Sequence, residues 1–452
     1  MALGSALAVA RNSLRVTSGQ MNVVSQNIAG ARDPDYVRRT NHTHARLYSG
    51  VYATVRRESN PHLLASHLNK TSEAVASNVI ASGITRLSDI YATDDFVRSP
   101  ARLLAGFRDS LQTWYNQFDQ AGPGDEAISR AKELASSLNE GSQAIARLRR
   151  EADQDIKASV GRINDLLQRF REVDRMVTGA AGRGRDIDAY TYMDERDALV
   201  KQLSEEIGIS TVTHNDGSMT IYGMDGSTLY DKEPRLITFS PATVLPAGAE
   251  GAAVYIDGVP LTHSSFRNQN GSGTLGGLLK VRDDIAPQYQ KQLDEIAAAL
   301  LDGFPEIFED STPGSGNIDL SGRLAVRAEL DVEKGGSAAA IGTRDKVLEL
   351  VNAFGKSRDY DGAAGISGSL TLIQYADNSL AWIENRRKDA ISDAQYRETM
   401  YMRSAETLSN ETGVNTDDEL ALMLQLEQSY SATAKIISAV GKMMDDLMAV
   451  IR

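Results

Sequence analysis

The residues of this chain that could do chemistry include a glycine-rich stretch. Gly271-Ser-Gly-Thr-Leu-Gly276 matches the G-x-G-x-x-G pattern of a dinucleotide-binding loop. That pattern holds a pyrophosphate where a buried strand leads into it within a βαβ unit. Here it follows the polar stretch SSFRNQN. We therefore expect a linker at this place, and no dinucleotide cofactor.

Four histidines form two closely spaced pairs, His42 with His44 and His62 with His67. Imidazole is a common metal ligand, but a metal site needs further ligands at a recognised spacing. Neither pair has such partners in the sequence. Solvated loop or helix-surface histidines, and no bound metal, are the favoured interpretation.

Carboxylates are the other candidates for chemistry. Asp216-Gly and Asp225-Gly lack the additional oxygen ligands of a calcium loop and predict turns. Pairs such as Asp283-Asp284 and Asp445-Asp446 could be taken for a glycosidase dyad. On a chain with 61 acidic residues nothing selects one pair, so a charged surface is favoured. The sequence predicts no enzyme.

Composition limits the class of protein further. A chain of 452 residues can form two to four domains. The net charge of −13 disfavours nucleic acid as a partner, and the chain has no apolar run of about 18 residues for membrane insertion. The absence of cysteine excludes disulfides and thiol chemistry. Arg11 and Arg15 interrupt the apolar start, so we expect no cleaved signal peptide.

Both ends of the chain carry apolar residues at alternating steps of three and four, the a/d spacing of a coiled coil. A single stripe of this kind fits an ordinary amphipathic helix, but two stripes at opposite ends favour pairing. Their charges are complementary, since residues 1–30 hold two arginines whereas 416–452 holds six acids and three bases. We define the N-terminal seam as Leu3, Leu7, Leu14, Met21, Val24 and Ile28, and the C-terminal seam as Met423, Leu426, Tyr430, Ile437, Val440, Met444, Leu447 and Ile451.

Turn and capping signals bound these terminal helices. Asp33-Pro34 predicts the end of the first helix, because the residue before proline avoids the α region, and Asp35 suits a turn. Residues 413–415, Gly-Val-Asn, predict a break before the last helix. Thr416-Asp-Asp-Glu419 fits a capping box, in which Thr416 accepts from the third helical N–H and Glu419 reaches back.

The middle of the chain is mostly helical in pattern. Apolar residues follow a helical period over about 60–208, with a break at 179–184 and a shorter helix at 192–207. Residues 209–275 show alternation and Asp-Gly turns, which predict a small β domain. Helical periodicity returns over 285–300, lapses over 303–340 and runs again from Arg344 to Glu411.

The predicted fold is mainly α with an inserted small β domain. We expect discontinuous, nested domains: a terminal coiled-coil domain from 1–45 and 414–452, a long-helix bundle from 46–208 and 276–413, and the β domain at 209–275.

The segment NVVSQNIAGARDPDYVRR resembles the start of bacterial flagellar axial proteins of the rod, hook and junction, which typically reads S-x-N-I-A-N-A-x-T-P-G-Y-x-R. Gly30, Asp33 and Asp35 depart from that pattern. The ending from Gly413, which contains QSYSATAKII, is similar to the C-terminal segment of the same family. The N-terminal pattern is kept by Ser25, Asn27, Ile28, Ala29, Ala31, Pro34, Tyr36 and Arg38.

A rod-type start followed by long helices, with GGLLKVRDDIAPQYQKQLDEIAAAL at 276–300, is most similar to the junction members of this family. The resemblance implies a structural subunit at the junction between hook and filament, exported by the type III pathway to the outside of the cell. It implies four partners: further copies in a ring or helical layer, the hook protein, the second hook-associated junction protein, and an export chaperone at the C-terminal helix, 416–452.

Two alternatives remain open. The chain could be another axial protein of the hook or rod type. It could instead be a secreted assembly subunit whose β domain carries an enzymatic or adhesive activity. The insert has fewer than 70 residues and no convincing catalytic set, which favours the structural role.

Overall fold

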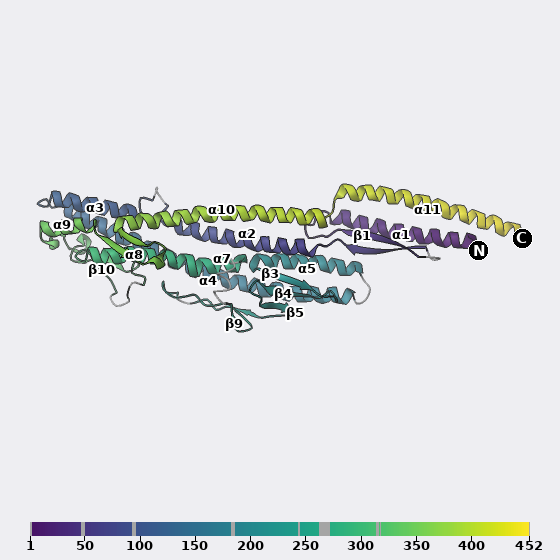
Figure 1. Cartoon of the computed structure of the whole chain (residues 1–452), viewed down its shortest axis with the longest axis horizontal. Coiled ribbons are helices and arrows are strands. Elements are labelled where there is room, and N and C mark those ends of the chain that lie inside the picture. Colours follow the sequence, from purple (N-terminus) through teal and green to yellow (C-terminus); the bar gives the residue numbers. More distant parts are fainter. Residues whose placement is uncertain are drawn as a thin grey trace. The chain divides into compact units, whose positions relative to one another are not determined.

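A computed structural model gives the architecture of the chain. It describes residues 2–46, 50–92, 96–181, 186–242, 245–261, 272–312, 316 and 318–451. Over these residues the chain is mainly helical, with several small sheets (Figure 1). None of the described helices has the length and apolar character needed to cross a bilayer.

Long helices dominate the described residues, and α4 alone has 59 residues. One stretch, η1, is a π-helix that joins α7 to α8 without a break. The longer helical elements are α1 (Ala2–Gly30), α2 (Pro61–Ser88), α3 (Pro100–Asn116), α4 (Pro123–Ala181), α5 (Asp186–Glu206), α7 (Gly273–Lys280), η1 (Val281–Ile285), α8 (Ala286–Gly303), α9 (Arg344–Ala353), α10 (Leu372–Thr412) and α11 (Thr416–Ile451).

The described strands form small antiparallel sheets. Three are hairpins: β1 (Arg39–Arg46) with β2 (Gly50–Arg57), β10 (Phe308–Asp310) with β11 (Leu324–Val326), and β12 (Ser357–Tyr360) with β13 (Gly368–Thr371). A four-stranded sheet has the order β3 (Ile209–Thr213), β4 (Met219–Gly223), β5 (Thr228–Asp231), β6 (Glu233–Pro234). A three-stranded sheet has the order β7 (Ile237–Thr238), β8 (Tyr255–Ile256), β9 (Val259–Pro260).

Contacts divide the chain into two compact units. Unit 1 comprises residues 1–71, 165–235 and 399–452, and unit 2 comprises 72–164 and 236–398. The four-stranded sheet belongs to unit 1 and the three-stranded sheet to unit 2. The nested domain boundaries expected from the sequence remain a prediction.

In unit 1 the two terminal helices pack against each other. The buried positions of α1 include Ala10, Thr17 and Val24, which are seven residues apart, and those of α11 include Leu426, Thr433 and Val440 with the same spacing. A seven-residue repeat on both helices is the arrangement of a coiled-coil seam. The predicted pairing of the chain ends in a mainly helical fold is therefore present.

Unit 2 has a hydrophobic core that includes an aromatic cluster of Phe107, Phe304, Phe308 and Phe354. Its helices approach closely at Gly277, where a Cβ atom would lie 2.9 Å from the Cβ of Val79 on α2. Glycine is required at such a contact because any larger residue would force the two backbones apart.

Three features of the fold differ from the sequence prediction. Residues 273–276 form the first turn of α7, so they are not a linker, whereas Gly271 lies outside the described residues. The helix expected from Arg344 to Glu411 is interrupted, because the β12–β13 hairpin separates α9 from α10. The β1–β2 hairpin has its two strands at residues 39–46 and 50–57, where the sequence indicated no strand.

Candidate assembly site

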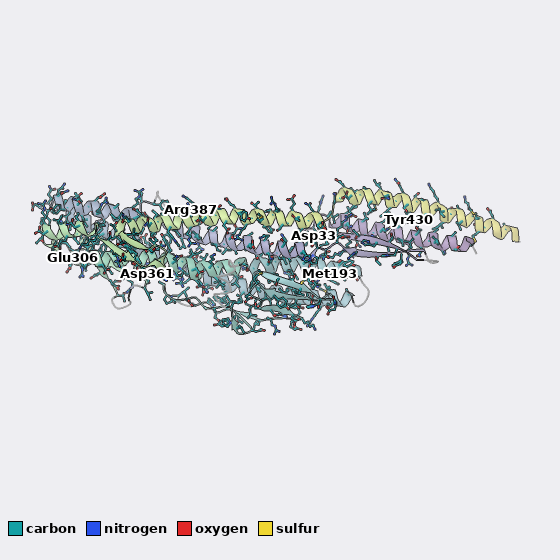
Figure 2. The ribbon with its side chains drawn as sticks, in the orientation of Figure 1. Asp33, Met193, Glu306, Asp361, Arg387 and Tyr430 are labelled. Carbon is teal, nitrogen blue, oxygen red and sulfur yellow. The ribbon has the colours of Figure 1, made fainter. Side chains whose placement is uncertain are left out.

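The turn after α1 has the form that its residues predict. The helix ends at Gly30, and the Asp33 carboxylate accepts the Asp35 N–H at 3.0 Å, as expected of an aspartate in a turn. A Cβ on Gly30 would lie 2.5 Å from the Tyr36 ring, so glycine allows this ring to cover the helix end. Burial raises the pKa of the Tyr36 hydroxyl. Figure 2 marks Asp33 in this turn, in unit 1.

Asn27 organises the turn through its side-chain amide, which is buried. Its Oδ1 accepts from the Arg39 N–H at 3.1 Å and from the Tyr36 hydroxyl at 3.0 Å. Its Nδ2 donates to the Arg39 carbonyl at 2.8 Å and to the Glu419 carboxylate at 3.1 Å. An amide group has two donors and two acceptor positions, so all four are used.

Glu419 connects this turn to the start of α11, and its side chain is 1% exposed. Its carboxylate accepts from Arg38 Nε at 2.8 Å as well as from Asn27. The predicted capping box is therefore wrong, because Glu419 does not serve the helix end. Asn415 occupies the cap position: its Oδ1 accepts from the Asp417 N–H, and its carbonyl accepts the first helical bond, from the Glu419 N–H.

The predicted break between α10 and α11 is present at residues 413–415. The Arg38 N–H donates to the carbonyl of Thr412, the last residue of α10, at 2.8 Å. Terminal carbonyls of a helix need such donors from outside the helix. Arg38 therefore contacts both helices: its main-chain N–H donates to the last carbonyl of α10, and its guanidinium group binds the side chain of Glu419 in the first turns of α11.

A buried ion-pair cluster connects the hairpin to α5. Asp194 accepts from Arg57 Nε at 2.8 Å and from Arg39 at 3.3 Å, and Arg57 also pairs with Asp197 at 2.7 Å. Lys201, on the same helix, pairs with Asp35 of the turn at 2.8 Å. Removing one member of a buried pair leaves an uncompensated charge, which costs about 3–5 kcal/mol. The sequence did not indicate this cluster.

The structure places the predicted seam residues in different environments. In the N-terminal seam Val24 is buried, and Leu7, Leu14, Met21 and Ile28 are partly buried. In the C-terminal seam Leu426 and Val440 are buried, Met423 and Ile437 are partly buried, and Tyr430 and Met444 are 41% and 38% exposed. Figure 2 marks Tyr430 on α11. The side chains of Leu3, Leu447 and Ile451 lie outside the described residues.

Residues of the family turn motif also differ in how far their side chains are buried. Asn27 is buried, and Ile28, Tyr36 and Arg38 are partly buried. Ala29 and Pro34 are exposed. Asn27 and Arg38 of the motif therefore contact Glu419 near the other end of the chain, whereas Tyr36 contacts Asn27 within the turn.

α11 carries a second set of apolar side chains that the monomer does not cover. They were not in the predicted seam, and the most exposed of them are Leu424 at 61%, Ile436 at 54% and Met443 at 54%. Large exposed apolar side chains gathered on one helix mark an interaction surface. The overall apolar content of α11 was the sequence signal that could have identified them.

Two interpretations of charged and polar residues need correction. His42, His44 and His62 are exposed as predicted, but His67 is buried, with its Nδ1 3.0 Å from the Ser404 hydroxyl. Among the residues that the structure describes, no group of three or more histidine, cysteine or acidic side chains could hold a metal ion.

The Asp283 side chain is only 2% exposed, so it does not belong to a charged surface. It pairs with Arg282 at 2.7 Å, and Arg282 also pairs with the buried Asp153 at 2.6 Å. Both arginine contacts lie within unit 2, where Arg282 is completely buried in η1. The aspartate therefore has a structural role.

The family models that match this chain both describe flagellar proteins. The family "Flagellar hook-associated protein FlgK helical domain" matches residues 86–318, and "Flagellar basal body rod FlgEFG protein C-terminal" matches 409–450. The second range contains Glu419 and most of α11.

Two relatives of this chain are both named flagellar hook-associated protein 1. Flagellar hook-associated protein 1 of Escherichia coli (strain K12) is 23% identical over 311 residues, which cover 65% of this chain and 55% of that protein. The chain thus spans about half the length of this relative. Flagellar hook-associated protein 1 of Bacillus subtilis (strain 168) is 19% identical over 518 residues, which cover 98% of this chain and 97% of the relative.

Among solved structures, that of the flagellar hook junction protein FlgK from Burkholderia pseudomallei matches with a TM-score of 0.44 and 20% identity, covering 55% of this chain and 44% of that one. The family match at 86–318 covers more than half of the 452 residues. The chain therefore belongs to the flagellar hook-associated protein FlgK family.

Proposed function

We propose that this protein is a non-enzymatic structural subunit of the bacterial flagellum, which forms the junction between hook and filament and assembles through its terminal helices. The observation that supports the proposal most directly is the contact of Asn27 with Glu419, which joins the two family segments from opposite ends of the chain. The names of the relatives support the same role.

The proposed location is outside the cell, within the flagellum. Further copies in a ring or helical layer, the hook protein and the second hook-associated junction protein are the proposed neighbours. Head-to-tail contacts of one type generate helical layers, and a neighbour of another type ends their growth. An export chaperone that covers the apolar side chains of α11 before secretion is the proposed cytoplasmic partner.

The exposed apolar side chains of α11 suggest how assembly occurs. A helix that has already buried Leu426 and Val440 against α1 still presents Leu424, Ile436 and Met443 to solvent. Burying such a side chain in an interface stabilises the assembly by about 1.5–3 kcal/mol each. We infer that neighbouring subunits cover these residues, while the predicted seams hold the two ends of one subunit together.

The test is a pair of double variants in a strain that lacks the native gene. Ile436→Asp with Met443→Asp alters only exposed positions, so the monomer should keep its thermal stability and its helix content. Incorporation should be lost, with hooks present, filaments absent and flagellin in the medium. A matched control, Gln425→Asp with Ser438→Asp, changes exposed polar positions on the same helix and should leave filaments normal.

A second pair of variants tests the predicted seams. Leu14→Asp with Met21→Asp, or Ile437→Asp with Met444→Asp, should also abolish incorporation. Leu14, Met21 and Ile437 are partly buried, so a carboxylate there weakens the pairing of the helices, and Met444 is exposed for contact with a neighbour. Normal filaments in all of these double variants would refute assembly through the terminal helices.

A further inference from the structure

The β1–β2 hairpin has only two strands, so each strand has one edge that the other does not cover. In an antiparallel pair, alternate residues direct their N–H and C=O groups toward the partner strand or away from it. Arg39 directs both of its groups away from β2, because it exchanges two hydrogen bonds with the Asn27 amide. Asn41 and Thr43, two and four residues further along β1, therefore also direct their groups outward.

The outer edge of β2 shows the same alternation of inward and outward main-chain groups, and α5 already contacts it. Val55 is opposite Asn41 in the register, and its carbonyl accepts from the Tyr190 hydroxyl of α5 at 3.0 Å. On β1 the Asn27 amide occupies only the first outward position. Over the described residues, the outward main-chain groups of Asn41 and Thr43 have no hydrogen-bond partner.

One face of the hairpin is open to solvent beside this edge. His42, His44, Thr54 and Arg56 are exposed, and Tyr52, which stacks on His44, is 41% exposed. These residues alternate with those that face α1 and α5, so they share one face. The free edge therefore borders an aromatic and basic surface.

The charge of this hairpin is opposite to that of the whole chain. Residues 39–57 contain four arginines and no acidic residue, on a protein with a net charge of −13. Arg39 and Arg57 pair with Asp194 within unit 1, but Arg56 is exposed. A carboxylate-bearing partner would complement this surface.

We propose that the free edge of β1 binds an extended, carboxylate-bearing segment of a protein partner by strand addition. The main-chain groups of Asn41 and Thr43 supply the hydrogen bonds, and Arg56 selects carboxylates. The strand is polar at its edge, which favours specific docking over aggregation. The identity of the source, a neighbouring subunit of the same flagellar assembly, rests on the proposed function.

Strand addition can be tested on the full chain with a fluorescein-labelled nine-residue peptide of alternating threonine and glutamate, followed by fluorescence anisotropy. The wild-type chain should bind it, and Thr43→Pro should weaken binding at least tenfold. Proline removes the outward N–H of residue 43 without removing a bond of the β1–β2 ladder. The matched control Thr43→Val keeps that N–H and should bind as the wild type does.

Two further probes separate main-chain from charge recognition. Two N-methylated versions of the peptide, one methylated at the threonines and the other at the glutamates, test the main-chain bonds without changing the protein. Each version lacks N–H donors along one edge, so the version whose methylated edge faces β1 should lose binding. A peptide with lysine in place of glutamate should bind more weakly, and Arg56→Gln should reduce the difference between the two peptides.

Failure of the wild-type chain to bind the glutamate peptide would overturn the proposal, as would undiminished binding of both N-methylated peptides. The result is independent of the proposed function. If the terminal-helix variants assemble normal filaments while the glutamate peptide still binds, assembly through the ends is wrong and strand addition at β1 stands.

Discussion

Asn27 Nδ2 donates a hydrogen bond to Glu419 Oε2 at 3.1 Å, although the two residues are 392 positions apart in the sequence. Both side chains are about 1% exposed. A buried carboxylate without donors carries a large desolvation cost. The N-terminal turn therefore has to be formed for the start of α11 to be stable in this position.

Asn27→Ala should lower the free energy of unfolding of unit 1 by about 2–4 kcal/mol, because several buried groups lose their partners at once. Urea unfolding of the full chain, followed by circular dichroism, measures the change. Asn22→Ala, at an exposed position of α1, is the matched control and should change stability by less than about 0.5 kcal/mol. Equal effects of the two substitutions would show that the amide contacts do not matter.

The long helices and the joined ends could be predicted from the sequence because each depends on local periodicity. The pattern over residues 60–208 gave α2 to α5, and the steps of three and four at both ends gave a heptad-spaced pair. Asp33-Pro34 and residues 413–415 ended the helices where local turn chemistry predicts.

The features that could not be predicted depend on contacts between residues that are far apart in the sequence. Thr416 to Glu419 is a good local capping box, but Arg38 and Asn27 bind the same carboxylate from across the sequence. The β1 sequence RTNHTHAR is polar on both faces, so it gives no alternation of apolar and polar residues. Asp283 was assigned to a charged surface because the sequence does not show that its neighbour and ion-pair partner Arg282 is buried against Asp153, which is 129 positions away.

Gly277→Ala should destabilise unit 2 by about 1–3 kcal/mol, the usual cost of overpacking. The new Cβ would lie 2.9 Å from the Cβ of Val79 and 3.0 Å from the Ala76 carbonyl oxygen, which is backbone and cannot rotate away. Gly106→Ala, in α3, is the matched control because nothing lies within 4 Å of its Cβ position. The control should stabilise the protein by up to about 1 kcal/mol through helix propensity. Thermal unfolding of both variants decides, and an unchanged Gly277→Ala protein would contradict the close approach.

Arg282→Ala should destabilise unit 2 by about 3–5 kcal/mol, because it leaves Asp153 and Asp283 buried without their cation. Urea unfolding measures the loss. Arg150→Ala, an exposed arginine on α4, should have little effect. If the two alanine variants were equally stable, the buried ion pairs of η1 would contribute nothing to the fold.

His67 should make unit 1 sensitive to pH. It is buried on α2, stacks on Tyr401 and lies 3.0 Å from the Ser404 hydroxyl. Burial, and secondarily the nearby Lys201 charge, lower the pKa of its imidazole, whereas Asp35 opposes them. The folded protein therefore favours the neutral ring, and the unfolded chain takes up the proton more readily.

Because the pKa of His67 is lower in the folded protein than in the unfolded chain, the protein should lose stability as the pH falls. The stability contributed by neutral His67 is complete above the unfolded pKa of about 6.5 and is lost as the pH falls through that value toward the lower folded pKa. His67→Phe keeps a ring to stack on Tyr401 but cannot titrate, so its melting temperature should fall less than that of the wild type between about pH 7.5 and pH 5.5. His62→Phe, at an exposed position of the same helix, should keep the wild-type dependence. A wild-type pH dependence in His67→Phe would assign the effect to other groups.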